Sequence, residues 1–130
     1  MERYYVGRRP QRGTEVYVVT AVDVKRLRHH GYRSGSPFDW GAISDGALEL
    51  AFALLAHATE SRPPDAVCEA FRGDVLARLD RPGFVLAYGD IALWLLVASG
   101  AFIRGDACQL PQPGSIRRVV RWLGSRFGRR

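Results

Sequence analysis

Residues Ser36 to Leu55 read SPFDWGAISDGALELAFALL, and this stretch decides the fold of the chain. It begins with a cluster of two aromatic residues, an aspartate and a glycine, and it continues directly into an apolar run. Such a cluster is typical of a loop whose shape is fixed by its own residues before a helix begins. We expect Phe38 and Trp40 to lie in the core rather than in an exposed recognition patch, because large aromatic side chains are usually buried.

The helix after this loop is predicted to run from Asp45 or Gly46 to His57, with Asp45 as its cap. Its apolar residues recur at helical spacing and cover a broad face, which indicates burial on two sides. They are Leu48, Leu50, Ala51, Phe52, Leu54 and Leu55. A second helix is expected to open at Pro64 and to carry its apolar face as far as Leu79.

Strands are predicted on both sides of this helical centre. Tyr and Val enrichment indicates strands over Tyr4–Val6 and Glu15–Val19, with Val22–Leu27 as a short third element. After the strong stop of residues 80–83, we expect a short strand over Phe84–Ala87. A third helix should then cover Ile91–Ala98, capped by Asp90 and ended by Gly100.

The predicted fold class is α+β: a small N-terminal antiparallel sheet packed with about three helices, plus an appended basic C-terminal helix. We expect a single domain over 1–104, a linker with two prolines over 105–114, and an amphipathic helix over 115–130. In that last helix Ile116, Val119, Val120, Leu123 and Phe127 line one side.

Charge is segregated along the chain. Of the net +6, residues 1–36 contribute +5, residues 37–110 contribute −5 and residues 111–130 contribute +6. The basic ends could bind nucleic acid or an acidic protein. We expect a cytoplasmic protein that does not enter the membrane. This expectation rests on the small number of cysteines, two, on the absence of a signal-peptide pattern, and on the polar residues that interrupt the apolar run 84–103.

The loop and first helix resemble a known family signature. The resemblance rests on Phe38, Asp39, Trp40, Gly41 and Gly46, followed by Leu50, Ala51, Ala53, Leu54, Leu55 and Ala56. It is similar to a small domain of unknown function found in bacteria, phages and other mobile elements, and it runs from Arg3 to about Ala98. The family carries more glycine after Trp-Gly than this chain does. The resemblance implies a fold and a genomic setting, and it implies no catalytic residue.

Two further hypotheses concern catalysis and zinc binding. An acid/base site could form from Asp39, Asp45, Glu49 and His57, but no nucleophile accompanies them. The simpler interpretation is that Asp45 caps the helix and that the other three side chains are solvated. The potential zinc ligands show no known ligand spacing; they are His29, His30, His57, Cys68 and Cys108. We expect Cys68 to be a small core residue, and we expect no enzyme activity, metal or cofactor.

The remaining hypothesis is binding. We expect a non-catalytic accessory protein of a mobile element that binds and inhibits a host protein complex, as anti-CRISPR and other anti-defence proteins do, with a nucleic-acid-handling complex as the target. The alternative is direct nucleic-acid binding, through a basic N-terminal hairpin with a tyrosine stacking platform and through the tail. The expected partner-binding residues are Arg8, Arg9, Arg12, Arg117, Arg118, Arg121, Trp122 and Arg126.

Overall fold

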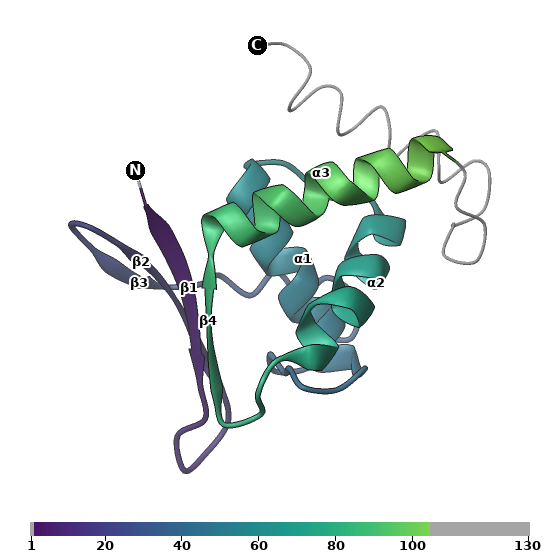
Figure 1. The fold of residues 1–130 in the computed structure, drawn as a ribbon. Helices are drawn as coiled ribbons and strands as arrows, with labels where there is room; N and C mark the ends of the chain where they lie inside the picture. Colours follow the sequence, from purple (N-terminus) through teal and green to yellow (C-terminus); the bar gives the residue numbers. More distant parts are fainter. Residues whose placement is uncertain (1, 105–130) are drawn as a thin grey trace.

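The computed structural model describes residues 2–104. These residues form a sheet with helices packed on one side of it (Figure 1). The elements are β1 (Arg3–Arg8), β2 (Glu15–Thr20), β3 (Val24–Arg26), α1 (Asp45–Thr59), α2 (Asp65–Asp74), the 3-10 turn η1 (Leu76–Arg78), β4 (Gly83–Ala87) and α3 (Tyr88–Arg104). The α+β prediction is confirmed, and the predicted tail helix over 115–130 lies outside the described residues.

The sheet has the order β3-β2-β1-β4, and all its neighbours are antiparallel. β4 follows α1 and α2 in sequence but pairs with β1, so the N-terminal strands and a late strand share one sheet. Tyr5 pairs with Val18 on one side and with Leu86 on the other. These three side chains are buried under the helices, and they form the sheet's contribution to the core.

Helix α1 is the centre of the core. Its residues from Gly46 to Leu55 are all buried, which confirms burial on more than one side. Ser44 caps the helix: its side chain accepts a hydrogen bond from the Ala47 N–H at 3.1 Å. The prediction that Asp45 is the cap was therefore wrong by one residue. The residue before it, Ser44, has its hydroxyl where it can accept from the N–H of the third helical residue, Ala47.

Helix α2 ends earlier than expected. It stops at Asp74, and a 3-10 turn replaces the last predicted turn. The tighter turn buries Leu76 completely, and its carbonyl accepts a hydrogen bond from the Gly41 N–H at 2.8 Å. The same carbonyl also accepts a hydrogen bond from the Leu79 N–H within the turn at 3.3 Å, so the turn joins the end of α2 to the loop before α1.

Helix α3 begins three residues before the predicted start and runs past Gly100. Asp90 is not its cap; it lies in the first turn and accepts a hydrogen bond from the Ala87 N–H at 3.0 Å, as in the second half of a capping box. Gly100 does not end the helix, because a glycine costs about 1 kcal/mol in a helix without breaking it. No helix among residues 2–104 has the length and apolar character to cross a membrane.

Candidate functional site

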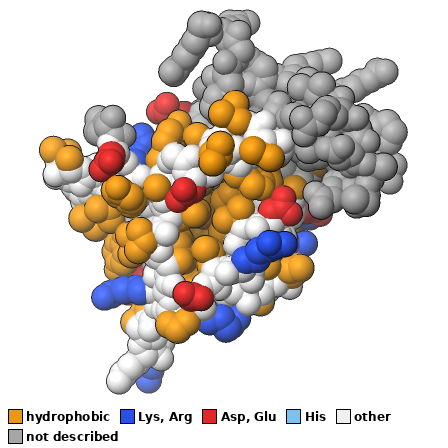
Figure 2. Space-filling view, in the orientation of Figure 1, with side chains coloured by type: hydrophobic (Ala, Val, Ile, Leu, Met, Phe, Trp, Pro, Cys, Tyr) orange, Lys and Arg blue, Asp and Glu red, His pale blue; other side chains and the backbone are white. Residues whose placement is uncertain are grey.

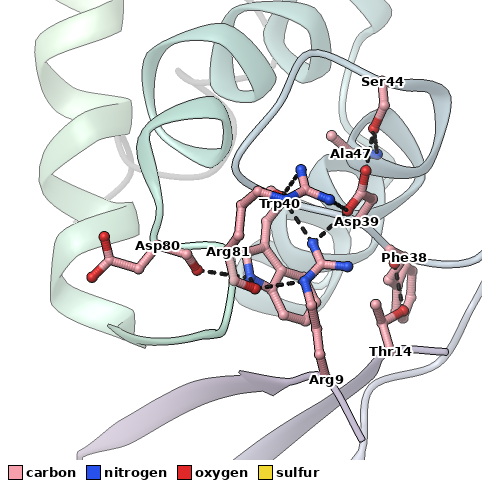
Figure 3. Close-up of polar contacts among 9 residues, drawn as sticks. All are labelled: Arg9, Thr14, Phe38, Asp39, Trp40, Ser44, Ala47, Asp80 and Arg81. Atoms are coloured by element: carbon pink, nitrogen blue, oxygen red, sulfur yellow. Dashed lines mark hydrogen bonds and ion pairs between the residues drawn. The ribbon is translucent and has the colours of Figure 1, made fainter. Parts of the chain in front are cut away.

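The Phe-Asp-Trp-Gly loop is held by a polar network around Trp40 (Figure 3). The indole N–H of Trp40 donates to the carbonyls of Asp80 and Arg81 at 3.0 and 3.1 Å. The Arg9 guanidinium lies over the indole ring, 4.5 Å from its centroid, and donates to the Trp40 carbonyl at 3.0 Å. Trp40 is completely buried, which confirms that it belongs to the core.

Asp39 connects this network to the start of α1. One carboxylate oxygen accepts a hydrogen bond from Arg9 at 2.6 Å, and the other accepts one from the Ser44 hydroxyl at 2.9 Å. Burial by itself would raise the pKa of Asp39, but the hydrogen bonds from Arg9 and Ser44 outweigh it and hold the pKa below its ordinary value. Asp39 is therefore an ionised structural group that orients the helix cap.

The two glycines of the signature are required by close packing. Gly41 adopts a left-handed φ of 78°. Gly46 has ordinary backbone angles, but a Cβ there would lie 2.2 Å from the Pro37 carbonyl oxygen. Asp39, Trp40, Gly41 and Gly46 thus each have a structural role.

The predicted binding arginines differ in their surroundings. Arg9 is engaged in the Trp40 network, whereas Arg12 is exposed in the turn between β1 and β2. Arg8 is exposed on the sheet and forms an ion pair with Glu15 at 2.7 Å. The other expected binding residues lie outside the described residues, and they are Arg117, Arg118, Arg121, Trp122 and Arg126.

The sheet presents a broad apolar surface on the side away from the helices. The strand registers place six large side chains there, which we call the open sheet face. Val24 and Val85, on the two edge strands, are 61% and 68% exposed, and the others are partly buried. The open sheet face comprises Tyr4, Val6, Tyr17, Val19, Val24 and Val85.

One end of the open sheet face is bordered by a small ionic cluster. The Glu15 carboxylate pairs with Arg8 at 2.7 Å and with Arg26 at 2.8 Å, and it also accepts a hydrogen bond from the Tyr17 hydroxyl at 2.8 Å. The hydrogen bond from Tyr17 and then those from Arg8 lower the pKa of Glu15. The cluster is thus ionised at neutral pH, and both guanidiniums already have a carboxylate partner.

A basic recess opens between the sheet and the end of α1. Two adjoining pockets of about 310 Å³ each share Arg3, Arg28 and His57 as lining residues. His57 Nδ1 is 2.9 Å from the buried hydroxyl of Tyr5. Burial and the nearby Arg3 charge lower the pKa of His57, so its imidazole is neutral at pH 7. The recess offers the guanidiniums of Arg3 and Arg28 and a neutral imidazole to a ligand. Its lining also includes the acidic residues Glu60 and Asp23, one in each pocket.

The residues considered for acid/base chemistry have other roles. Glu49 was expected to be solvated, and this was wrong: it is 2% exposed, and its carboxylate accepts hydrogen bonds from the backbone N–H groups of Tyr32, Arg33 and Ser34. Sequence gave one signal for this, an acidic residue inside an apolar helical run. Within residues 2–104 no cluster of three or more metal-ligating side chains occurs.

Sequence reasoning missed the open sheet face as a unit. Its signal was the lack of alternation in the strands: Tyr4 to Val6 and Val16 to Val19 are continuous apolar runs, where a sheet with one solvated face normally alternates apolar and polar residues. Hydrophobic side chains reach the surface along the strands in Figure 2. Such runs indicate strands that are covered on both faces.

Comparison with known proteins gives a family and no further relative. No curated protein and no solved structure shows a significant match to the chain. One family model matches residues 5–97, which include the signature loop, the sheet and most of α3. The chain therefore belongs to the family of unknown function DUF6166.

Proposed function

We propose that this chain is a non-catalytic protein-binding module that docks a partner protein on its open sheet face. The observation that carries the proposal is the apolar character of both sheet faces. The helices cover Tyr5, Val18 and Leu86, whereas the equally apolar Val24 and Val85 are left exposed. A contiguous exposed apolar patch with a polar border is typical of protein interfaces.

The charges around this face favour a protein over a nucleic acid. Nucleic-acid-binding surfaces present unpaired arginine and lysine side chains to phosphates. Here Glu15 engages both Arg8 and Arg26, so the border has paired charges of both signs. A partner surface with an apolar centre and its own mixed charges complements this arrangement.

The partner that we propose is a host protein complex that the chain blocks by occupying an interface, in the cytoplasm and as a mobile-element accessory factor. A small chain can inhibit in this way without catalysis, because covering a binding surface is sufficient. An anti-defence role such as anti-CRISPR activity is one form of this function, and a complex that handles nucleic acid is the target class we favour.

Matched variants test the proposal. Val85→Asp places a charge in the open sheet face, and Ile43→Asp places the same charge at an equally exposed position in the loop before α1. Each chain is used to capture partners from nuclease-treated host lysate, and the captured protein is then purified and titrated. We expect the parent and Ile43→Asp to bind one protein stoichiometrically, and Val85→Asp to lose it while keeping the parent melting temperature.

The proposal fails if Val85→Asp binds the purified partner as tightly as Ile43→Asp does. It also fails if the open sheet face is covered by a second copy of the chain, which light scattering would show as a dimer that Val85→Asp dissociates. A repeat with Val24→Asp on the opposite edge strand distinguishes loss of the face from a local effect on β4.

The basic recess supports nucleic-acid binding as a second candidate function. Arg3 and Arg28 line both of its pockets, and Lys25 lines one. If these residues and the tail together neutralise about six phosphates, log affinity for duplex DNA should fall against log salt with a slope of about −5. Arg28→Ala should make that slope shallower by about 1. A flat salt dependence would exclude this candidate.

A further inference from the structure

Helix α3 carries an apolar stripe on its outer side. Leu93, Leu96 and Val97 are 62%, 58% and 60% exposed, whereas Ile91 and Leu95 on the same helix are buried. The spacing of three and four residues places the exposed three on one face. We call them the α3 stripe, and Figure 2 shows hydrophobic side chains at the surface over this helix.

The sequence after α3 contains an apolar face without an assigned partner. Ile116, Val119, Val120, Leu123 and Phe127 share one side of the helix predicted over 115–130. A helix of this length is marginal in water on its own, and its stability depends on burying that side. A segment of this kind needs a docking surface of matching helical geometry.

The length of the connection places the α3 stripe well within reach of the tail, and closer to it than the open sheet face. Residues 105–114 can span at most roughly 35 Å. Val97 lies seven residues before Arg104, or about 10 Å back along α3 at its rise of 1.5 Å per residue. Helix α3 has 17 residues and is about 25 Å long. The open sheet face lies beyond the other end of this helix and on the far side of the sheet (Figure 1).

Charge around the stripe complements the tail. Two exposed acidic residues lie near the α3 stripe. Asp74 accepts a hydrogen bond from the Trp94 indole at 3.2 Å, and Asp90 lies in the first turn of α3. Residues 111–130 contain six arginines and no acidic residue. Acidic residues beside an apolar stripe attract a basic amphipathic helix.

We propose that residues 115–130 fold as an amphipathic helix that packs its apolar side on the α3 stripe of the same chain, antiparallel to α3. The arginines of the tail then face outward and beside Asp74 and Asp90. The partner of the α3 stripe is thus this chain's own tail, and the open sheet face remains free for another protein.

Paramagnetic relaxation in the full chain tests this placement. Cys108→Ser removes one thiol, and the buried Cys68 thiol, whose pKa burial raises to about 12, does not compete for the label. A spin label attached at Ser125→Cys, off the apolar side, reports on nearby amides. We expect the amide signals of residues 93–97 to lose most of their intensity, and those of β2 and β3 to keep theirs.

Leu96→Asp provides the matched variant, and Ile43→Asp provides its control, since both replace an exposed apolar side chain by a charge. Leu96→Asp should restore the α3 signals, whereas Ile43→Asp should leave them broadened. Unbroadened α3 signals in the labelled parent would overturn the proposal, as would broadening confined to the sheet. Broadening that appears only when labelled and isotope-enriched chains are mixed would show docking onto a second copy, which also overturns it.

Discussion

Replacing Trp40 tests the structural account of the signature loop most directly. Trp40 is completely buried, makes an edge contact with Phe84 at a centroid distance of 4.9 Å, and satisfies two backbone carbonyls with its indole N–H. Truncating a buried tryptophan to alanine typically costs about 3 to 5 kcal/mol. Since domains of this size have about 5 to 15 kcal/mol of stability in total, Trp40→Ala should lose a large share of it.

A second substitution separates packing from hydrogen bonding. Trp40→Phe keeps a ring in the core but removes the N–H that serves Asp80 and Arg81, and it should cost about 1 to 3 kcal/mol. Trp94→Phe is the matched control, because the indole of Trp94 is only partly buried and donates to the exposed carboxylate of Asp74. We expect this control to cost less than about 1 kcal/mol.

The assay is urea denaturation of the full chain followed by far-ultraviolet circular dichroism, with the free energy of unfolding obtained by linear extrapolation. The expected order of stability is parent, Trp94→Phe, Trp40→Phe, Trp40→Ala. If Trp40→Ala does not fold, the two phenylalanine variants still provide the comparison. A Trp40→Phe variant as stable as Trp94→Phe, or a Trp40→Ala variant within about 1 kcal/mol of the parent, would refute this account.

Three further predictions concern single residues. The pKa of Asp39 is lower in the folded protein than its unfolded value of about 3.9, so the ionised carboxylate stabilises the fold above that pH. This stabilisation is lost as the pH falls through the folded pKa. Asp39→Asn should therefore destabilise the protein at neutral pH, and its urea midpoint should fall less steeply than that of the parent as the pH is lowered into the acid range. Gly46→Ala should lower the melting temperature because its Cβ would overlap backbone, whereas Gly73→Ala, with open space around the Cβ, should raise stability by up to about 1 kcal/mol. In a Cys108→Ser background, Cys68 should react with a thiol reagent only in urea; rapid reaction in native buffer would contradict its burial.

Local sequence was sufficient for the elements that depend on neighbouring residues. The burial of Trp40 and the extent of α1 follow from aromatic, glycine and apolar spacing within one short stretch. The exact caps were harder, because aspartate is favoured both at the cap and within the first turn, and Asp45 and Asp90 each lie in the first turn.

The features that sequence could not supply depend on residues distant in the chain. The contact of the 3-10 turn with the loop before α1 is a hydrogen bond between Gly41 and Leu76, and the burial of Glu49 depends on backbone N–H groups of the loop around Arg33. The open sheet face required the strand register, since only the pairing of β4 with β1 brings Val85 beside Val6.

The pairing of β4 with β1 has a consequence for synthesis of the chain on the ribosome. The partner of β1 on one side, β2, follows it directly in the chain, but the second edge of β1 has no partner until residues 83–87 have been made. Two helices must therefore be made while that strand edge is open, and an open edge is the site at which nascent chains associate wrongly. A stall or truncation before Ala87 should yield aggregation-prone fragments, whereas chains that pass this point pair the second edge of β1 with β4.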